Sequence, residues 1–117
     1  MRLPPPVSLW LPVFAWALLI FALSSVPSLA TGLGLWDTIL RKIAHGVEFA
    51  ILGALLVRAL ERRVPAFLVG VLYAVSDEIH QSFVPGRHAS PLDVAIDGVG
   101  VLVGVAIYTR FARPPSV

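Results

Sequence analysis

Apolar residues along this chain fall into four blocks, separated by connections of 19, 3 and 7 residues that contain polar residues or proline. The blocks are residues 7–23, 43–60, 64–83 and 91–109, and the third becomes polar after Ser76. Each is close to the about 17 to 25 residues that an α-helix needs to cross a bilayer. The blocks show almost none of the polar faces at helical period that a soluble helix has. The pattern predicts an all-α, polytopic membrane protein, a bundle of four transmembrane helices.

The composition agrees with this interpretation. Of the 117 residues, 57% are hydrophobic and only 14% are charged, which lies outside the usual range of soluble domains. A chain of this length has room for one domain, so we expect a single membrane domain over residues 1–117. The absence of cysteine excludes disulfides, thiolate nucleophiles and zinc–thiolate sites.

The first block has an alternative interpretation as a secretory signal peptide. Arg2 precedes the apolar run, and Ser28-Leu29-Ala30 after it could be a small-residue cleavage site. The run over residues 7–23 is, however, longer than the about 7 to 15 residues of a signal's apolar region. We therefore expect the block to be retained as a span.

The basic residues predict a topology and not a nucleic-acid partner, because they lie at the ends of the apolar blocks and the net charge is only +2. If the spans alternate, one side receives Arg2, Arg58, Arg62, Arg63, Arg110 and Arg113, and the other receives Arg41, Lys42 and Arg87. The positive-inside rule then predicts that both termini and the connection over residues 61–63 are cytoplasmic.

Polar residues inside the blocks gather toward the predicted outer side. They are His45 and Glu48 in the second block, Asp77, Glu78, His80 and Gln81 in the third, and Asp93 and Asp97 in the fourth. Spacings of three or four place residues of each block on one helical face. A charge at mid-bilayer costs about 2.5 to 3.5 kcal/mol even on a lenient scale, so we expect these faces to surround a polar pocket. Helical rise predicts two layers, with Glu48, Asp77 and Asp97 deepest.

The connection between the third and fourth blocks predicts a tight outer hairpin. Val84-Pro85-Gly86 is typical of a turn and would present Arg87 at the surface. Ser90-Pro91-Leu92-Asp93 is typical of a helix start, with Ser at the N-cap, Pro at N1 and an acid at N3.

Several of these segments together resemble a known family. The most specific is SDEIHQSFVPGR at residues 76–87; the others are IFALSSVP at 20–27, KIAH at 42–45, FAILG at 49–53, Asp93, and residues 98–104. The chain resembles the VanZ-like family, small integral membrane proteins named after an accessory protein of glycopeptide-resistance clusters and associated with teicoplanin resistance. The resemblance covers most of the chain and implies a multi-pass protein of the bacterial cytoplasmic membrane with an outward-facing polar constellation. Family members commonly have Asn where this chain has Asp97, which implies a more acidic pocket here.

Three classes of function remain open. The first is a membrane enzyme that acts on a lipid-linked or cell-wall precursor at the outer leaflet. Glu78 or Asp77 would be its general base and His45 or His80 the partner acid. Arg87 would hold a phosphate or carboxylate, and the substrate site would be completed by Gln81, Glu48, Asp93 and Asp97. No known hydrolase motif is present, so the reaction type stays open.

The second class is a binding or resistance module without turnover, in which the pocket recognises a membrane lipid or a lipoglycopeptide. The third is a metal-dependent site, since His45 and Glu48, and also Asp77 and His80, are His/carboxylate pairs at a spacing that bundles use to hold metals. We assign no metal ligand among them, because the Arg87 guanidinium opposes a cation, and no other cofactor follows from the sequence.

The polar residues also have a purely structural interpretation. Asp93 could simply cap a helix together with Ser90, and His45 could hydrogen-bond between helices. Gly100 and Gly104 form a Gly-x-x-x-Gly spacing, next to Gly98, that permits close helix packing. All the ionisable groups could form one salt-bridge network. Because ionisable residues that face the inside of a membrane bundle are functional candidates by default, we favour a functional role.

The predicted topology can be tested by cysteine labelling, which the absence of native cysteine makes straightforward. In intact cells, we expect Gly86→Cys to react with a membrane-impermeant maleimide and Arg62→Cys to react only after lysis. The opposite pattern would place the polar constellation on the cytoplasmic side.

Overall fold

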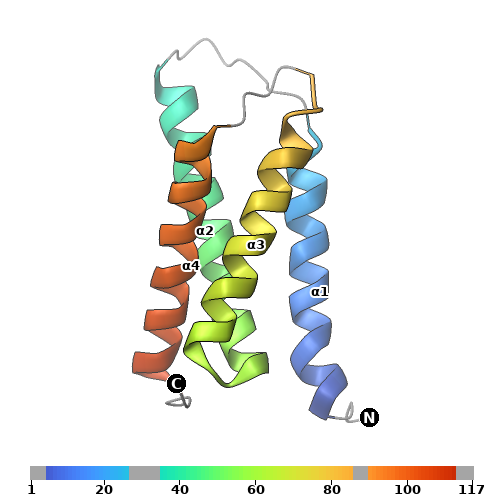
Figure 1. Cartoon of the computed structure of the whole chain (residues 1–117), viewed down its shortest axis with the longest axis vertical. Coiled ribbons are helices and arrows are strands. Elements are labelled where there is room, and N and C mark those ends of the chain that lie inside the picture. Colours follow the sequence, from blue (N-terminus) through green and yellow to red (C-terminus); the bar gives the residue numbers. More distant parts are fainter. Residues whose placement is uncertain (1–4, 27–34, 86–89, 113–117) are drawn as a thin grey trace.

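The computed structural model describes residues 5–26, 35–85 and 90–112, which form four α-helices (Figure 1). The helices are α1 (Pro5–Ser24), α2 (Leu35–Leu60), α3 (Arg63–Gln81) and α4 (Pro91–Phe111). The all-α prediction is confirmed. Successive helices run in opposite directions, so α1 and α3 end where α2 and α4 begin (Figure 1); we call this the polar end of the bundle.

The helix bounds differ most from the prediction in α2, which begins at Leu35 and not at residue 43. Residues 35–42 contain Asp37, Arg41 and Lys42, and these charges hide the helix from a search for apolar residues. Asp37 lies in the first turn of the helix, where a negative charge is favourable. Helix α3 ends at Gln81, two residues before the predicted end at residue 83.

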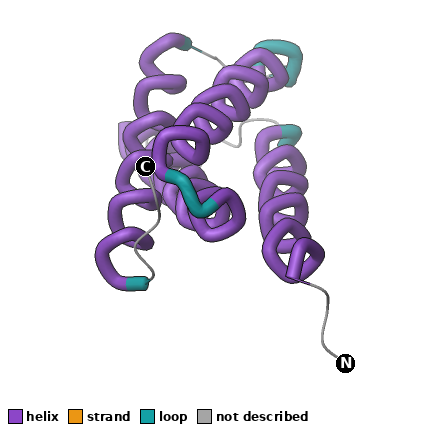
Figure 2. The backbone as a smooth tube through the Cα atoms, turned by 60° about the horizontal axis from the view of Figure 1, so that its bottom comes forward, coloured by secondary structure: helices purple, strands orange, loops and turns teal. Residues whose placement is uncertain are grey.

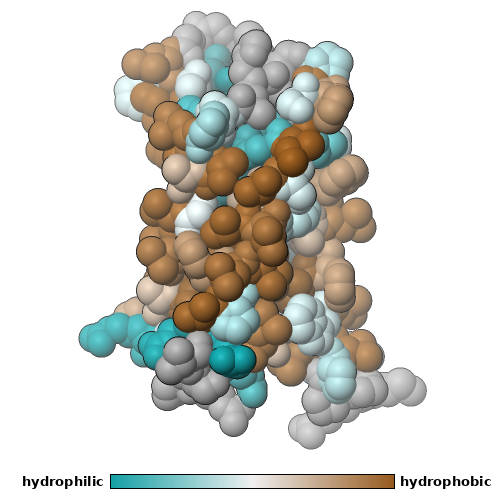
Figure 3. All heavy atoms as spheres, in the orientation of Figure 1, coloured by the Kyte–Doolittle hydropathy of each residue, from teal (hydrophilic) through white to brown (hydrophobic). Residues whose placement is uncertain are grey.

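Three of the helices, α1, α2 and α4, are long and apolar enough to cross a membrane. Helix α3 has 19 residues but ends in polar residues, which lower its average hydropathy. Large apolar side chains such as Phe14, Leu72 and Val99 stay well exposed. The face of the molecule in Figure 3 shows a hydrophobic band between two more polar ends. Such a continuous apolar surface is typical of contact with lipid and not with water.

Helices α2 and α4 make the most extensive contact in the described part of the chain. Glycines make it possible: a Cβ atom added to Gly104 would lie 1.8 Å from the Ala50 carbonyl oxygen, and one added to Gly100 would lie 2.4 Å from the Gly46 carbonyl oxygen. The close packing predicted from the Gly-x-x-x-Gly spacing is thus confirmed at these two positions. Gly98 has more room, with its nearest neighbour at 3.8 Å.

Helix α3 packs on both α2 and α4, whereas α1 packs on α2 and α3 and stands at one side of the bundle (Figure 2). Trp16 of α1 donates a hydrogen bond of 2.8 Å to the Glu48 carbonyl oxygen of α2. Tyr73 of α3 donates one to the Ala17 carbonyl oxygen of α1. These bonds fix α1 against the other helices at mid-height, where no water competes for them.

The connections follow ordinary capping rules. Between α2 and α3, Glu61 adopts a φ of 59°, and its N–H donates to the Val57 carbonyl oxygen at 2.8 Å, as in a left-handed C-terminal cap. At the start of α4, the Ser90 side chain accepts a hydrogen bond of 3.3 Å from the Asp93 N–H, and Pro91 follows Ser90. The predicted helix start at Ser90 is confirmed.

The glycine contacts predict a large difference between two alanine substitutions on α4. Gly104→Ala forces α4 away from the Ala50 carbonyl and should destabilise the protein by about 1 to 3 kcal/mol, the usual cost of overpacking. Gly98→Ala is the matched control, because its Cβ meets only an ordinary contact. Thermal unfolding in detergent should show a lower Tm for Gly104→Ala alone, and equal values for both variants would contradict the close α2–α4 packing.

Candidate functional site

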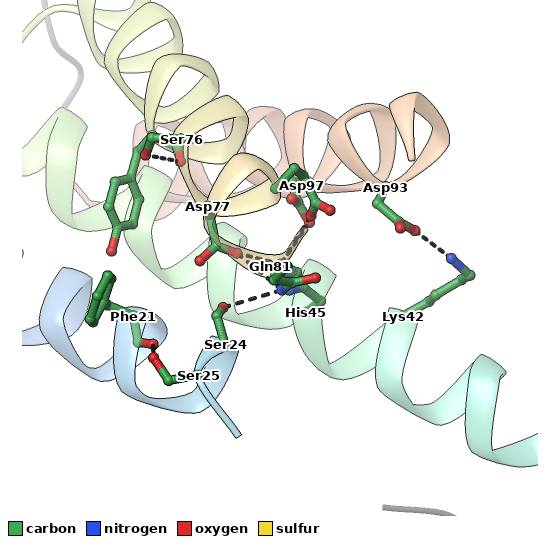
Figure 4. A network of polar contacts seen from close by, with 12 residues as sticks. Phe21, Ser24, Ser25, Lys42, His45, Ser76, Asp77, Gln81, Asp93 and Asp97 are labelled. Atoms are coloured by element: carbon green, nitrogen blue, oxygen red, sulfur yellow. Dashed lines mark hydrogen bonds and ion pairs between the residues drawn. The ribbon is translucent and has the colours of Figure 1, made fainter. Parts of the chain in front are cut away.

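Four ionisable side chains from three helices converge inside the bundle, toward the polar end. His45 comes from α2, Asp77 and Glu78 from α3, and Asp97 from α4. One nitrogen or oxygen atom of each lies within 4.8 Å of the corresponding atoms of the others. We call these four residues the acid–histidine cluster (Figure 4, where Glu78 is not labelled).

The geometry of the cluster centres on one atom, Nε2 of His45. It lies 3.1 Å from Oδ2 of Asp77, 3.3 Å from Oδ1 of Asp97 and 3.6 Å from Oε1 of Glu78. An imidazole nitrogen carries at most one hydrogen, so it cannot donate to three carboxylates at once. Together with the burial of all three acids, which are at most 5% exposed, this crowds three carboxyl groups around one imidazole nitrogen inside an apolar bundle.

The local structure explains why these residues meet. Asp77 and Glu78 are neighbours in sequence and both are buried, whereas Ser76 and Ile79 on either side of them are exposed, so the pair lies on the face of α3 that packs against the other helices. Gly46 follows His45 in the chain, and the contact of Gly100 with the Gly46 carbonyl brings α4 against α2 at this level. Asp97, one turn before Gly100, therefore reaches the imidazole.

A hydrogen-bond relay joins the cluster to α1. Gln81 is buried, and its amide nitrogen donates to Oδ2 of Asp77 at 3.3 Å and to the Ser24 hydroxyl at 3.2 Å. Ser24 is itself only 2% exposed. Ser24 is not among the residues predicted for the site, although a pair of serines that ends an apolar span is a signal that could have revealed it.

Asp93, on the same helix as Asp97, has a different role. Its carboxylate pairs with Lys42 of α2 (Figure 4). Lys42 is 37% exposed and Asp93 15%, so the pair lies at the rim. This ion pair, together with the position of Asp93 in the first turn of α4, supports the structural interpretation of Asp93.

Two further candidates are not among the four converging residues. His80 lies on the α1 side of α3, with Nε2 3.2 Å from the Ser25 hydroxyl, and its ring stacks on Phe21 at 4.2 Å between centroids. Glu48 contributes its backbone carbonyl to Trp16, and its carboxylate does not belong to the cluster. The structure thus joins His45 to Asp77, Glu78 and Asp97 in place of the pairings His45–Glu48 and Asp77–His80 expected from spacing.

Arg87, the expected phosphate or carboxylate ligand, lies outside the described residues. The expectation of two layers is not met for His45, because its contacts with Asp77 and Asp97 place the three side chains at one level. The reason is that α2 begins well before residue 43, so His45 does not lie near a helix end.

Comparison with known proteins identifies one family. The family model described as VanZ/LLP1 matches residues 7–112. No curated protein and no solved structure matches the chain.

The uneven distribution of charge predicts opposite effects of the same substitution at two places on α4. In detergent with EDTA, Asp97→Asn should stabilise the protein by about 0.5 to 2 kcal/mol, the usual gain when a strained functional site is relieved. Asp93→Asn, the matched control, loses a partly exposed ion pair and should cost about 1 kcal/mol or less. Thermal unfolding measures both, and a lower Tm for Asp97→Asn than for Asp93→Asn would show that Asp97 is a structural residue.

Proposed function

The chain belongs to the VanZ/LLP1 family, and from this premise we propose that it is a multi-pass protein of the bacterial cytoplasmic membrane that binds a cell-envelope molecule. The ligand is the polar headgroup of a membrane lipid or of a lipid-linked precursor, and the acid–histidine cluster is the binding site. Three apolar helices long enough to span a membrane support the location.

The observation that carries this proposal is the cluster itself. Three carboxylates that are at most 5% exposed meet one imidazole, which is an expensive arrangement inside a membrane bundle. Replacing a buried ionic group by apolar residues is often neutral or stabilising. The cluster does not make folding more favourable, so we attribute its presence to ligand binding.

The position of the cluster suits a headgroup. Asp97 lies six residues after Pro91, the first residue of α4, or about 9 Å along the axis at 1.5 Å per residue. His45 has 15% of its side chain exposed, against 6% or less for the acids, so a ligand would meet the imidazole first. The arginines Arg58, Arg62, Arg63 and Arg110 belong to the opposite end, and by the positive-inside rule that end is cytoplasmic and the cluster faces the outer leaflet.

Acid–base catalysis on the bound molecule is a second candidate, favoured by the contact of 3.1 Å between Nε2 of His45 and Oδ2 of Asp77. A carboxylate that orients an imidazole is a common arrangement for moving a proton. Of the sequence-based roles, this keeps Asp77 and His45 together and leaves His80 aside. A contribution to teicoplanin resistance follows if the bound molecule is a lipid-linked cell-wall precursor, and this part of the proposal comes from the family resemblance.

Native mass spectrometry of the purified protein tests the binding proposal. Protein in detergent is mixed with total lipid extract of a bacterial membrane, and the masses of the retained lipids are measured. We expect the wild type to retain one headgroup class selectively, and both Glu78→Gln and Asp97→Asn to lose most of this signal. Glu61→Gln is the control, because it removes an exposed carboxylate at the opposite end of the bundle.

The same spectra separate the two candidates. New lipid species that form with the wild type and not with Glu78→Gln would favour catalysis, whereas selective retention without new species favours binding alone. If all four proteins retain the same lipids in the same amounts, the cluster does not bind a headgroup.

A further inference from the structure

We propose that the acid–histidine cluster is a site for one divalent transition-metal cation, such as Mn²⁺, Fe²⁺ or Zn²⁺. The ligands are Nε2 of His45 and one oxygen each of Asp77, Glu78 and Asp97. The inference rests on the proposed function, because it names the group through which this site would hold an anionic headgroup.

The distances around His45 match those between ligands of a common metal ion. Metal–nitrogen and metal–oxygen bonds of about 2.0 to 2.2 Å place neighbouring ligand atoms roughly 3.0 to 3.5 Å apart in tetrahedral or octahedral geometry. The three separations from Nε2 are 3.1, 3.3 and 3.6 Å. Nε2 of His45 thus already lies at nearly the spacing from each of the three oxygens that a bound cation requires, and all four donor atoms lie within 4.8 Å of one another.

The carboxylates of Glu78 and Asp97 provide an independent observation. Both side chains are more than nine-tenths buried; none of their four oxygens accepts a hydrogen bond from an N–H group in the described part of the chain, and the two carboxyl groups lie in contact with each other. The distance of 3.6 Å from Glu78 to His45 is too long for a hydrogen bond. Buried carboxylates are normally paired or bound to a metal, and these two point into the cluster.

The donor set indicates the class of cation. Carboxylate oxygens suit Mg²⁺, Ca²⁺ and Mn²⁺, whereas an imidazole nitrogen suits Zn²⁺ and iron, so one imidazole with three carboxylates favours Mn²⁺, Fe²⁺ or Zn²⁺. A divalent cation also removes most of the electrostatic cost, since two positive charges offset two of the three carboxylates.

The surroundings support a metal site as well. Gln81 donates to the Asp77 oxygen that faces His45, and Ser24 holds Gln81 in turn, which is the kind of outer-shell contact that orients ligands in metal sites. Lys42, the nearby cation on α2, is engaged by Asp93 at the rim. Lys42 is therefore not available to neutralise the carboxyl groups of the cluster, which can bind a cation.

A bound cation would decide which headgroups the site accepts. Three carboxylates alone repel the phosphate or carboxylate of an anionic lipid, whereas a cation with a free coordination position attracts one. The chemical class of ligand that we infer is thus an anionic headgroup, such as a phosphate group, bound through the metal.

The test is metal binding by the full chain in detergent. EDTA-treated, desalted protein is incubated with MnCl₂, ZnCl₂ or MgCl₂, freed of unbound metal on a desalting column, and analysed by elemental mass spectrometry. We expect retention of about one Mn²⁺ or Zn²⁺ per chain and little Mg²⁺. Glu78→Gln and Asp97→Asn should weaken binding at least about tenfold, while Glu61→Gln should bind as the wild type does.

Thermal unfolding shows whether a variant fails to bind metal only because it does not fold. Added Mn²⁺ or Zn²⁺ should raise the Tm of the wild type and of Glu61→Gln, and should leave that of Glu78→Gln unchanged. A wild type that retains no stoichiometric metal and shows no shift would overturn the inference, as would a Glu78→Gln that binds metal normally.

Lipid retention measured with EDTA and with Mn²⁺ separates this inference from the proposed function. Retention that requires the metal supports both. Retention that is equal with EDTA overturns the metal-mediated contact and leaves headgroup binding intact. Metal binding without any lipid retention supports the metal site and contradicts headgroup binding.

Discussion

A charged side chain that faces hydrocarbon costs free energy, and this constraint explains where the polar and apolar side chains of the molecule lie. Apolar side chains cover the outside of all four helices, whereas the acids that cannot face lipid turn inward and meet. Asp77, Glu78 and Asp97 are buried and gather around His45. The usual arrangement of a soluble protein, with polar residues outside and apolar residues inside, is reversed near the polar end.

The close approach of α2 and α4 brings His45 and the three acids within contact distance of one another. Gly100 against the Gly46 carbonyl, and Gly104 against Ala50, let the two backbones touch, and this packing takes the place of the hydrophobic effect that lipid removes. His45 and Asp97 lie next to these contacts. The same glycines thus stabilise the bundle and hold the cluster in place, so that packing offsets the electrostatic cost of the site.

Hydropathy and capping rules predicted the helices well, because block length and the Ser90 cap depend on local sequence. They did not reveal that α2 begins at Leu35, since charged residues in its first turns interrupt the apolar pattern. The candidate residues of the cluster were predicted, but not which of them would meet. Spacing shows which residues share a face of one helix, but the rotation of each helix is set by its neighbours, and this rotation sends His80 toward Phe21 while it buries Glu78.

The distribution of charge along the bundle links the proposed metal site to the proposed binding of a headgroup. The buried acids lie toward one end, and Lys42, a basic residue at the rim among the described residues, is already paired with Asp93. An anionic headgroup would therefore be repelled unless a cation came with it. By thermodynamic linkage, a cation that raises the affinity for the headgroup must itself bind more tightly when the headgroup is present. The cluster would then respond to two ligands together, and neither alone would satisfy its charge.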